Sequence, residues 1–160
     1  MSAAFFDSTL ERLLRAHFSS RTKKQARLIE PLFEMFGPLS TFSSKIRVSY
    51  AIDLIPEWIA SDLDLVRRIR NERSHSLESR TFQDLDIGGL IDQFMALTKI
   101  AAGGGGIAVH LAKVPPANQG RWKFVQATSR IAGQLQATVV VHHSDAPESL
   151  KRNFMISSEL

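Results

Sequence analysis

Arg70, Asn71 and His75 are the residues of this chain whose types and spacing come closest to a catalytic set. A guanidinium group holds a phosphate through two hydrogen bonds, and a histidine that titrates near neutral pH can take a proton from a ribose 2′-hydroxyl. Residues of these types could therefore hold a phosphate and move a proton beside it. Residues five apart on a straight helix are separated by roughly 140° around its axis. We expect Arg70 and His75 to reach one phosphate only at a helix end or across two copies of the chain.

The same three residues also fit a structural role. Asn71 and His75 are neighbours at positions i and i+4, and a histidine near a helix C-terminus can hydrogen-bond the last carbonyl groups. Arg70 can pair with Asp64 or Glu72 of its own chain or of a second copy. We favour this structural interpretation over catalysis. Phosphate or nucleotide binding without cleavage is a third alternative.

Two clusters of basic residues could contact nucleic acid or an acidic protein. Their members are Arg21, Lys23, Lys24 and Arg27, and then Arg67, Arg68, Arg70 and Arg73. Runs of charge usually form a solvated helix face, and few aromatic residues interleave with these, so a stacking platform for single-stranded nucleic acid is not expected. The net charge of +4 permits contact with phosphate without requiring it.

Other signatures of chemistry are missing from the sequence. There is no cysteine, which excludes disulfides, thiolate zinc sites and cysteine nucleophiles. The glycines at 103–106 are not followed by Lys-Ser or Lys-Thr, so they form no phosphate loop. His142 and His143 have no third ligand at a useful spacing, and we predict neither a metal nor another cofactor. No stretch reaches the roughly 20 apolar residues of a membrane span and no secretory signal is evident, so we expect a cytoplasmic protein without membrane contact.

The apolar pattern predicts an all-α fold. The chain has 160 residues, of which 44% are apolar, enough for one core. Repeats at three and four residues predict helices over 5–18, 28–36, 43–54, 57–70, 87–100 and 122–139. Thr41 or Ser43 is expected to cap the third, and Pro31 to kink or split the second. We predict a single-domain bundle of about six helices over 1–141, with a glycine-rich break before the last helix and a flexible tail over 142–160.

Three segments in a set order, at 37–46, 50–55 and 62–76, resemble the mannitol operon repressor family of helical bacterial regulators. The residues that carry the resemblance are Phe42, Lys45, Ile46, Tyr50, Arg70, Asn71 and His75. The resemblance implies negative control of a sugar-alcohol operon. The chain departs from the family pattern at two places: Arg73 and Ser74 stand where an apolar residue and alanine are usual, and Asp53 stands where glycine is usual.

The spacing from Arg70 to His75 also resembles the Arg-x4-His motif of HEPN domains. These helical modules include metal-independent endoribonucleases, in which the arginine and histidine of two subunits meet at a dimer interface. The resemblance implies an alternative function, an endoribonuclease or a phosphate-binding module that uses Arg70, Asn71 and His75.

A repressor raises the question of how DNA is contacted. Residues 43–70 have suitable lengths for a helix-turn-helix, but the turn carries Asp53 where glycine is usual, and the second helix must bury Trp58 and Leu63. Direct DNA contact through such a motif is therefore not expected. We predict a non-enzymatic repressor of sugar-alcohol metabolism that forms homo-oligomers and acts through a regulatory or phosphotransferase-system protein.

Overall fold

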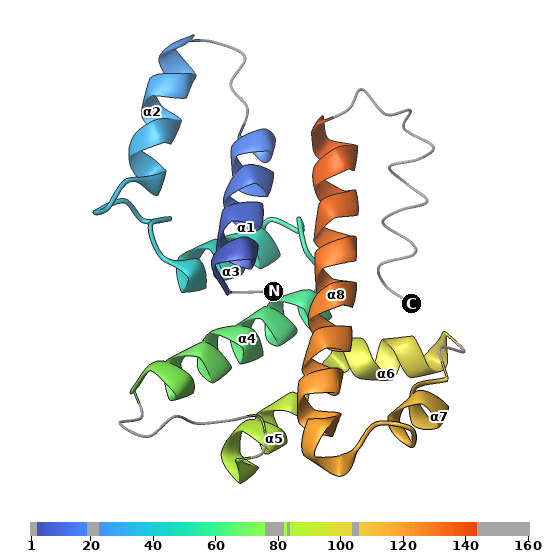
Figure 1. Cartoon of the computed structure of the whole chain (residues 1–160). Coiled ribbons are helices and arrows are strands. Elements are labelled where there is room, and N and C mark those ends of the chain that lie inside the picture. Colours follow the sequence, from blue (N-terminus) through green and yellow to red (C-terminus); the bar gives the residue numbers. More distant parts are fainter. Residues whose placement is uncertain (1–2, 19–22, 76–81, 83, 104–105, 144–160) are drawn as a thin grey trace. The chain divides into compact units, whose positions relative to one another are not determined.

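The computed structural model describes residues 3–18, 23–75, 82, 84–103 and 106–143. These residues form eight helices and no strand, which confirms the predicted all-α class (Figure 1). The helices are α1 (Ala3–His17), α2 (Lys23–Phe33), α3 (Phe42–Ala51), α4 (Glu57–His75), α5 (Leu85–Ile91), α6 (Met95–Ala102), α7 (Ile107–Leu111) and α8 (Pro116–His143). They belong to two compact units, built mainly from residues 58–133 and from residues 4–57 together with the end of α8.

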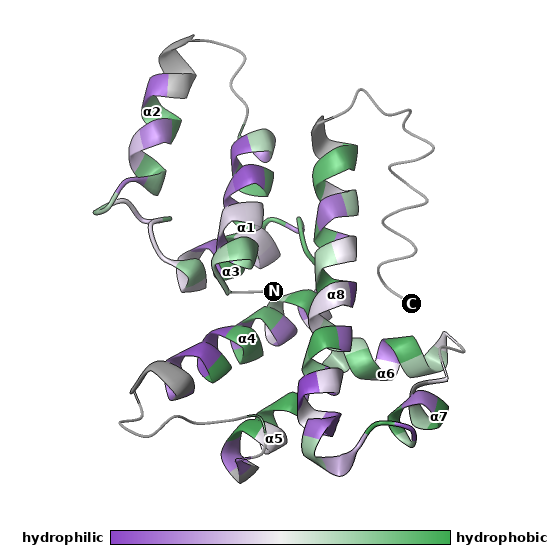
Figure 2. Cartoon of the chain, in the orientation of Figure 1, coloured by the Kyte–Doolittle hydropathy of each residue, from purple (hydrophilic) through white to green (hydrophobic). Residues whose placement is uncertain are grey.

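Apolar stripes on α1 and α4 form much of the two cores. On α1, the side chains of Phe6, Leu10 and Leu14 are fully buried, as their helical spacing predicts. On α4, Ile59 and Leu63 are fully buried, and polar residues alternate with them along the helix (Figure 2). The prediction that the helix over 57–70 buries its apolar stripe is confirmed by α4.

A buried ammonium group joins α3 to α1. Lys45 is 3% exposed; its Nζ donates to Glu11 Oε2 at 2.8 Å and lies 3.0 Å from Asp7 Oδ1. Burial lowers the pKa of Lys45, but the hydrogen bonds and negative charges of Glu11 and Asp7 outweigh this effect and raise the pKa above its ordinary value. Lys45 therefore stays charged and links two helices that are distant in sequence.

Arg15 extends this network from α1 to α2. Its Nε donates to Glu11 Oε1 at 2.9 Å, its Nη1 donates to Glu30 Oε2 at 2.8 Å, and its guanidinium lies 4.2 Å from the ring centre of Phe33. Burial raises the pKa of Glu11, but the hydrogen bonds from Lys45 and Arg15 outweigh it, and the pKa falls below its ordinary value. The Glu30 side chain is 64% exposed, so the ion pair with α2 contributes less than the buried pair with α3.

Both ends of α3 carry capping motifs. Thr41 Oγ1 accepts a hydrogen bond from Ser44 N at 3.1 Å, so Thr41 is the cap. At the other end, Asp53 N donates to Tyr50 O at 3.0 Å and Leu54 N donates to Ser49 O at 2.9 Å. These two bonds form a Schellman motif, which needs a left-handed residue, and Asp53 supplies it with a φ of 57°. Asp53 stands where glycine is usual in the family pattern, and glycine is the residue that adopts this left-handed backbone conformation with the least strain.

The single helix predicted over 87–100 is wrong, because α5 ends at Ile91 and α6 starts at Met95. The break has a cause on α4. Asp62 Oδ1 and Oδ2 accept hydrogen bonds at 2.8 Å from the backbone N–H groups of Met95 and Ala96, the first two residues of α6. These N–H groups have no partner within their own helix, and the helix N-terminus favours a negative charge. Burial raises the pKa of Asp62 to about 6, although the two backbone donors lower it.

Other predicted boundaries also differ from the structure. The second helix ends at Phe33, three residues early, and Pro31 lies inside it without splitting it. α7 was not predicted, and α8 starts at Pro116 instead of Trp122, because proline is well suited to a first helical position. Of the predicted tail, only His142 and His143 are described, at the end of α8; residues 144–160 lie outside the described residues.

We expect the substitution Asp62→Asn to remove one specific component of the pH dependence of stability. Because the pKa of Asp62 is higher in the folded than in the unfolded chain, the folded chain binds more protons between about pH 4 and pH 6. The contribution of Asp62 to the free energy of unfolding therefore falls as pH rises through this window, by up to about 3 kcal/mol. Asparagine does not titrate. Urea unfolding from pH 4 to pH 7 should show the difference, wild type minus variant, falling with pH; a flat or rising difference contradicts this assignment.

We expect Lys45→Met to lower the free energy of unfolding by about 1–3 kcal/mol at pH 7, because Asp7 and Glu11 lose their shared counterion. The loss should shrink at acid pH, because the pKa of Glu11 in the folded chain lies below its ordinary value and its contribution disappears as pH falls through that lowered pKa. The triple variant Lys45→Met, Asp7→Asn, Glu11→Gln should recover most of the lost stability. Denaturant unfolding of the three proteins tests this, and a triple variant no more stable than Lys45→Met would refute it.

The left-handed backbone at Asp53 predicts opposite effects of two small residues. Asp53→Gly should raise the free energy of unfolding by about 0.5–1 kcal/mol, because glycine adopts a φ of 57° without a Cβ clash. Asp53→Ala should lower it, because alanine keeps the Cβ and cannot hydrogen-bond locally. Thermal unfolding of both variants provides the comparison, and the same direction of change for both would count against strain at this residue.

Candidate functional site

The residues that carry the family resemblance are mostly structural. Phe42 and Ile46 are each 5% exposed on α3, and the buried Lys45 lies between them in the sequence. Tyr50, at 46% exposure, is the member of this set on α3 that reaches solvent. The segment around Phe42 therefore secures α3 against α1 and offers little chemistry to a ligand.

Arg70 and Asn71 lie on α4 and contact each other. Arg70 Nε and Nη2 donate to Asn71 Oδ1 at 3.3 Å and 3.1 Å, and the arginine side chain is exposed. His75 is the last residue of α4, the helix end that the spacing argument requires. The side chains of His75 and Arg73 lie outside the described residues.

The described basic residues Arg68 and Arg70 lie on different sides of α4. Arg67 Nε donates to Asp64 Oδ1 at 2.8 Å, so a carboxylate offsets its charge. Arg68 and Arg70 are exposed, but two residues along a helix are separated by roughly 160° around its axis. Of the first basic cluster, Arg27 is exposed on α2; Arg21 and the side chains of Lys23 and Lys24 lie outside the described residues.

Among the residues that the structure describes, the two most exposed large apolar side chains adjoin one another in the turn between α2 and α3. Met35 is 80% exposed and Phe36 is 96% exposed, and Leu28 on α2 is 67% exposed. The helical pattern placed Leu28 and Phe36 on one apolar face of a helix, but α2 ends before Phe36. Nearly complete exposure of a phenylalanine is uncommon, and exposed apolar groups of this kind mark interaction sites.

Backbone hydrogen bonds hold this turn in place. Gly37 N donates to Glu34 O at 2.8 Å, and Leu39 N donates to Leu32 O at 2.8 Å. A Cβ on Gly37 would lie 2.3 Å from Pro31 O and 2.4 Å from Leu32 O, so the backbone packs too closely for any other residue. Leu39 is buried beyond the turn. Phe36 is therefore presented to solvent by an ordered turn, which we call the Phe36 turn (residues 34–40).

The unit of residues 58–133 has exposed apolar residues of its own. Met95 is 45% exposed, Val109 is 62% exposed and Val125 is 44% exposed. They lie on three different helices, and single exposed apolar residues are normal on protein surfaces. In the part of the chain that the structure describes, no helix is both long and apolar enough to span a membrane.

Comparisons with known proteins agree with the fold. The family model described as mannitol repressor (MtlR) matches residues 1–112. Among solved structures, a chain of the MtlR–HPr complex from Escherichia coli matches with a TM-score of 0.62 and 18% identity, over 81% of this chain and 83% of that chain. No curated protein matches. Since the family model covers more than half of the chain, this protein belongs to the mannitol repressor family.

Proposed function

We propose that this chain is a non-enzymatic, repressor-like regulator of sugar-alcohol metabolism that acts by binding partner proteins. Membership of the mannitol repressor family supports the regulatory role. The solved structure with the same fold is a complex of its MtlR with HPr, so the HPr of the same organism is the first candidate partner of this chain. We also propose that the chain self-associates.

The observation that carries the proposal is the Phe36 turn. Aromatic side chains dominate the energy of protein interfaces when they fill a pocket on the partner. Burying one phenylalanine contributes roughly 2–3 kcal/mol, which corresponds to a factor of 30 or more in the dissociation constant. Because hydrogen bonds already order the turn, binding would lose little conformational entropy there.

The geometry of α4 supports a partner protein over DNA. Its apolar stripe is buried, and Asp64 pairs with one of its three neighbouring arginines, Arg67. The other two, Arg68 and Arg70, project in different directions. A recognition helix needs side chains on one face that reach base edges together, and Arg68 and Arg70 do not share a face.

The ribonuclease alternative has weaker support. Asn71 Oδ1 receives two donors of the Arg70 guanidinium, an arrangement that favours a role within the helix over readiness to hold a phosphate. We therefore retain the structural interpretation of Arg70, Asn71 and His75.

We expect Phe36→Ser to weaken the binding of purified HPr by at least roughly 30-fold, because the variant loses the apolar side chain that the partner would bury. The matched control is Val109→Ser, which removes a 62% exposed apolar side chain from α7. Isothermal titration calorimetry gives the dissociation constants, and circular dichroism checks that both variants fold.

Unchanged affinity in Phe36→Ser, or equal losses in both variants, would show that the Phe36 turn is not the binding surface. Failure of the wild-type chain to bind HPr would remove HPr as the partner.

A further inference from the structure

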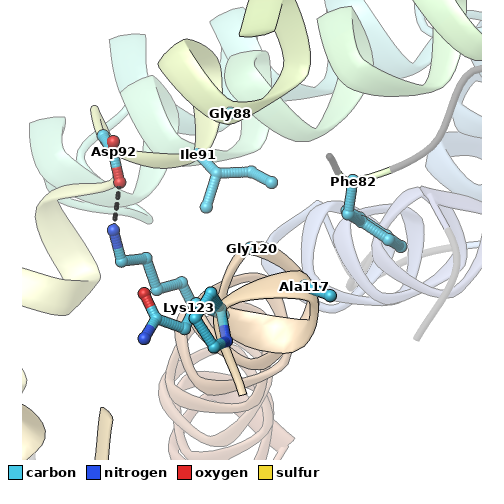
Figure 3. Close-up of a pocket in the computed structure, with 9 residues that line it drawn as sticks. Phe82, Gly88, Ile91, Asp92, Ala117, Gly120 and Lys123 are labelled. Carbon is cyan, nitrogen blue, oxygen red and sulfur yellow. Dashed lines mark hydrogen bonds and ion pairs between the residues drawn. The ribbon is translucent and has the colours of Figure 1, made fainter. Parts of the chain in front are cut away.

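An open surface pocket of about 400 Å³, here called the cavity, lies in the unit of residues 58–133, between α5, the start of α8 and Phe82. Its lining residues are Phe82, Gly88, Ile91, Asp92, Pro116, Ala117, Gln119, Gly120 and Lys123 (Figure 3). This volume falls within the range of small-molecule sites. None of these nine residues is among those that carry the family resemblance.

One wall of the cavity is polar and close to neutral overall. Lys123 Nζ lies 2.6 Å from Asp92 Oδ1, and Figure 3 shows this pair at one side of the space. Gln119 Nε2 donates to Val114 O at 3.2 Å, which leaves the amide oxygen as an acceptor. The wall thus offers an ammonium donor, carboxylate acceptors and an amide, with no excess of positive charge.

Phe82, the aromatic residue of the lining, is held by contacts with other phenylalanines. The rings of Phe82 and Phe124 are 5.3 Å apart, and Phe124 contacts Phe94 edge to face at 6.0 Å. Gly120 permits this arrangement, because a Cβ there would lie 2.6 Å from Phe82 O. Phe82 and the aliphatic Ile91 are the large apolar residues of the lining, and Figure 3 shows Ile91 between the ion pair and Phe82.

We propose that this cavity binds a neutral polyhydroxylated small molecule, a polyol or sugar. Its hydroxyl groups would donate to Asp92 and accept from Lys123, and its C–H groups would contact Phe82 and Ile91. An anion would compete with Asp92 for Lys123, and a wholly apolar ligand would remove both charged groups from water without hydrogen bonds in return. The choice of a polyol rests on the proposed function, because an effector of sugar-alcohol regulation belongs to this chemical class.

Two adjacent glycines of α5 provide a matched test. Gly88 lines the cavity and Gly89 does not, yet a Cβ at either position meets no atom within 4 Å. Gly88→Leu should therefore fill the cavity without disturbing the fold, and Gly89→Leu should place the same side chain outside it. Both remove a glycine from a helix, so their effects on helix propensity cancel in the comparison.

The probe is mannitol, measured by isothermal titration calorimetry and by thermal unfolding. We expect wild type and Gly89→Leu to bind it equally, with a rise in Tm of roughly 3–6 °C at ten times the dissociation constant. Gly88→Leu should lose at least tenfold in affinity, and Lys123→Met should also bind more weakly. The pair of Lys123 and Asp92 is partly exposed, so its loss should change stability little.

Equal mannitol binding by Gly88→Leu and Gly89→Leu, or no binding by wild type, overturns the proposal. Binding of inorganic phosphate in place of mannitol would identify an anion site and overturn it equally. HPr binding by Gly88→Leu, measured without mannitol, separates the two proposals. If this variant binds HPr and wild type does not bind mannitol, only the proposed polyol site is wrong.

Discussion

The buried carboxylate of Asp62 determines the architecture of the unit around residues 58–133. It lies on α4, yet it fixes the first residues of α6 by accepting the N–H groups of Met95 and Ala96. The apolar residues from Ile87 to Ile100 have the periodicity of one continuous helix, so their pattern alone does not predict the break. The break that results leaves Asp92 between α5 and α6, where it pairs with Lys123 of α8. A capping interaction across more than thirty residues thus shapes the wall of the cavity.

Lys45 has the corresponding role in the other unit, with the opposite charge. Its ammonium group is buried against Asp7 and Glu11, and Glu11 also accepts from Arg15, which reaches Glu30 on α2. Removing Lys45 would leave the partly buried carboxylates of Asp7 and Glu11 without their shared counterion, so the cost would exceed the net gain from forming the network. The network holds α1, α2 and α3, and through α2 it supports the segment from which the Phe36 turn projects.

Local sequence patterns predicted the positions of most helices, but they did not reveal what causes several of these helices to end. The stripe from Phe6 to Leu14 is a local pattern, and so are the cap at Thr41 and the start of α4 after Pro56. The end of α5 depends on Asp62, which is distant in sequence, and no periodicity could reveal it. The exposure of Phe36 was missed for a related reason. Its spacing from Leu32 and Phe33 suits a helix, but Gly37 packs against the carbonyl groups of Pro31 and Leu32, and the chain turns first.

The segments that identify the family are poor guides to where ligands bind. Phe42, Lys45 and Ile46 are buried, so the resemblance they carry reports how α3 is held and not what the surface does. A buried ion pair tolerates few substitutions, because the partner group left behind lacks compensation, whereas an exposed phenylalanine is bound by no such constraint. A sequence can therefore keep the family fold while its contacts with partners and ligands change. The specific behaviour of this chain has to be sought at the Phe36 turn and at the wall formed by Asp92 and Lys123.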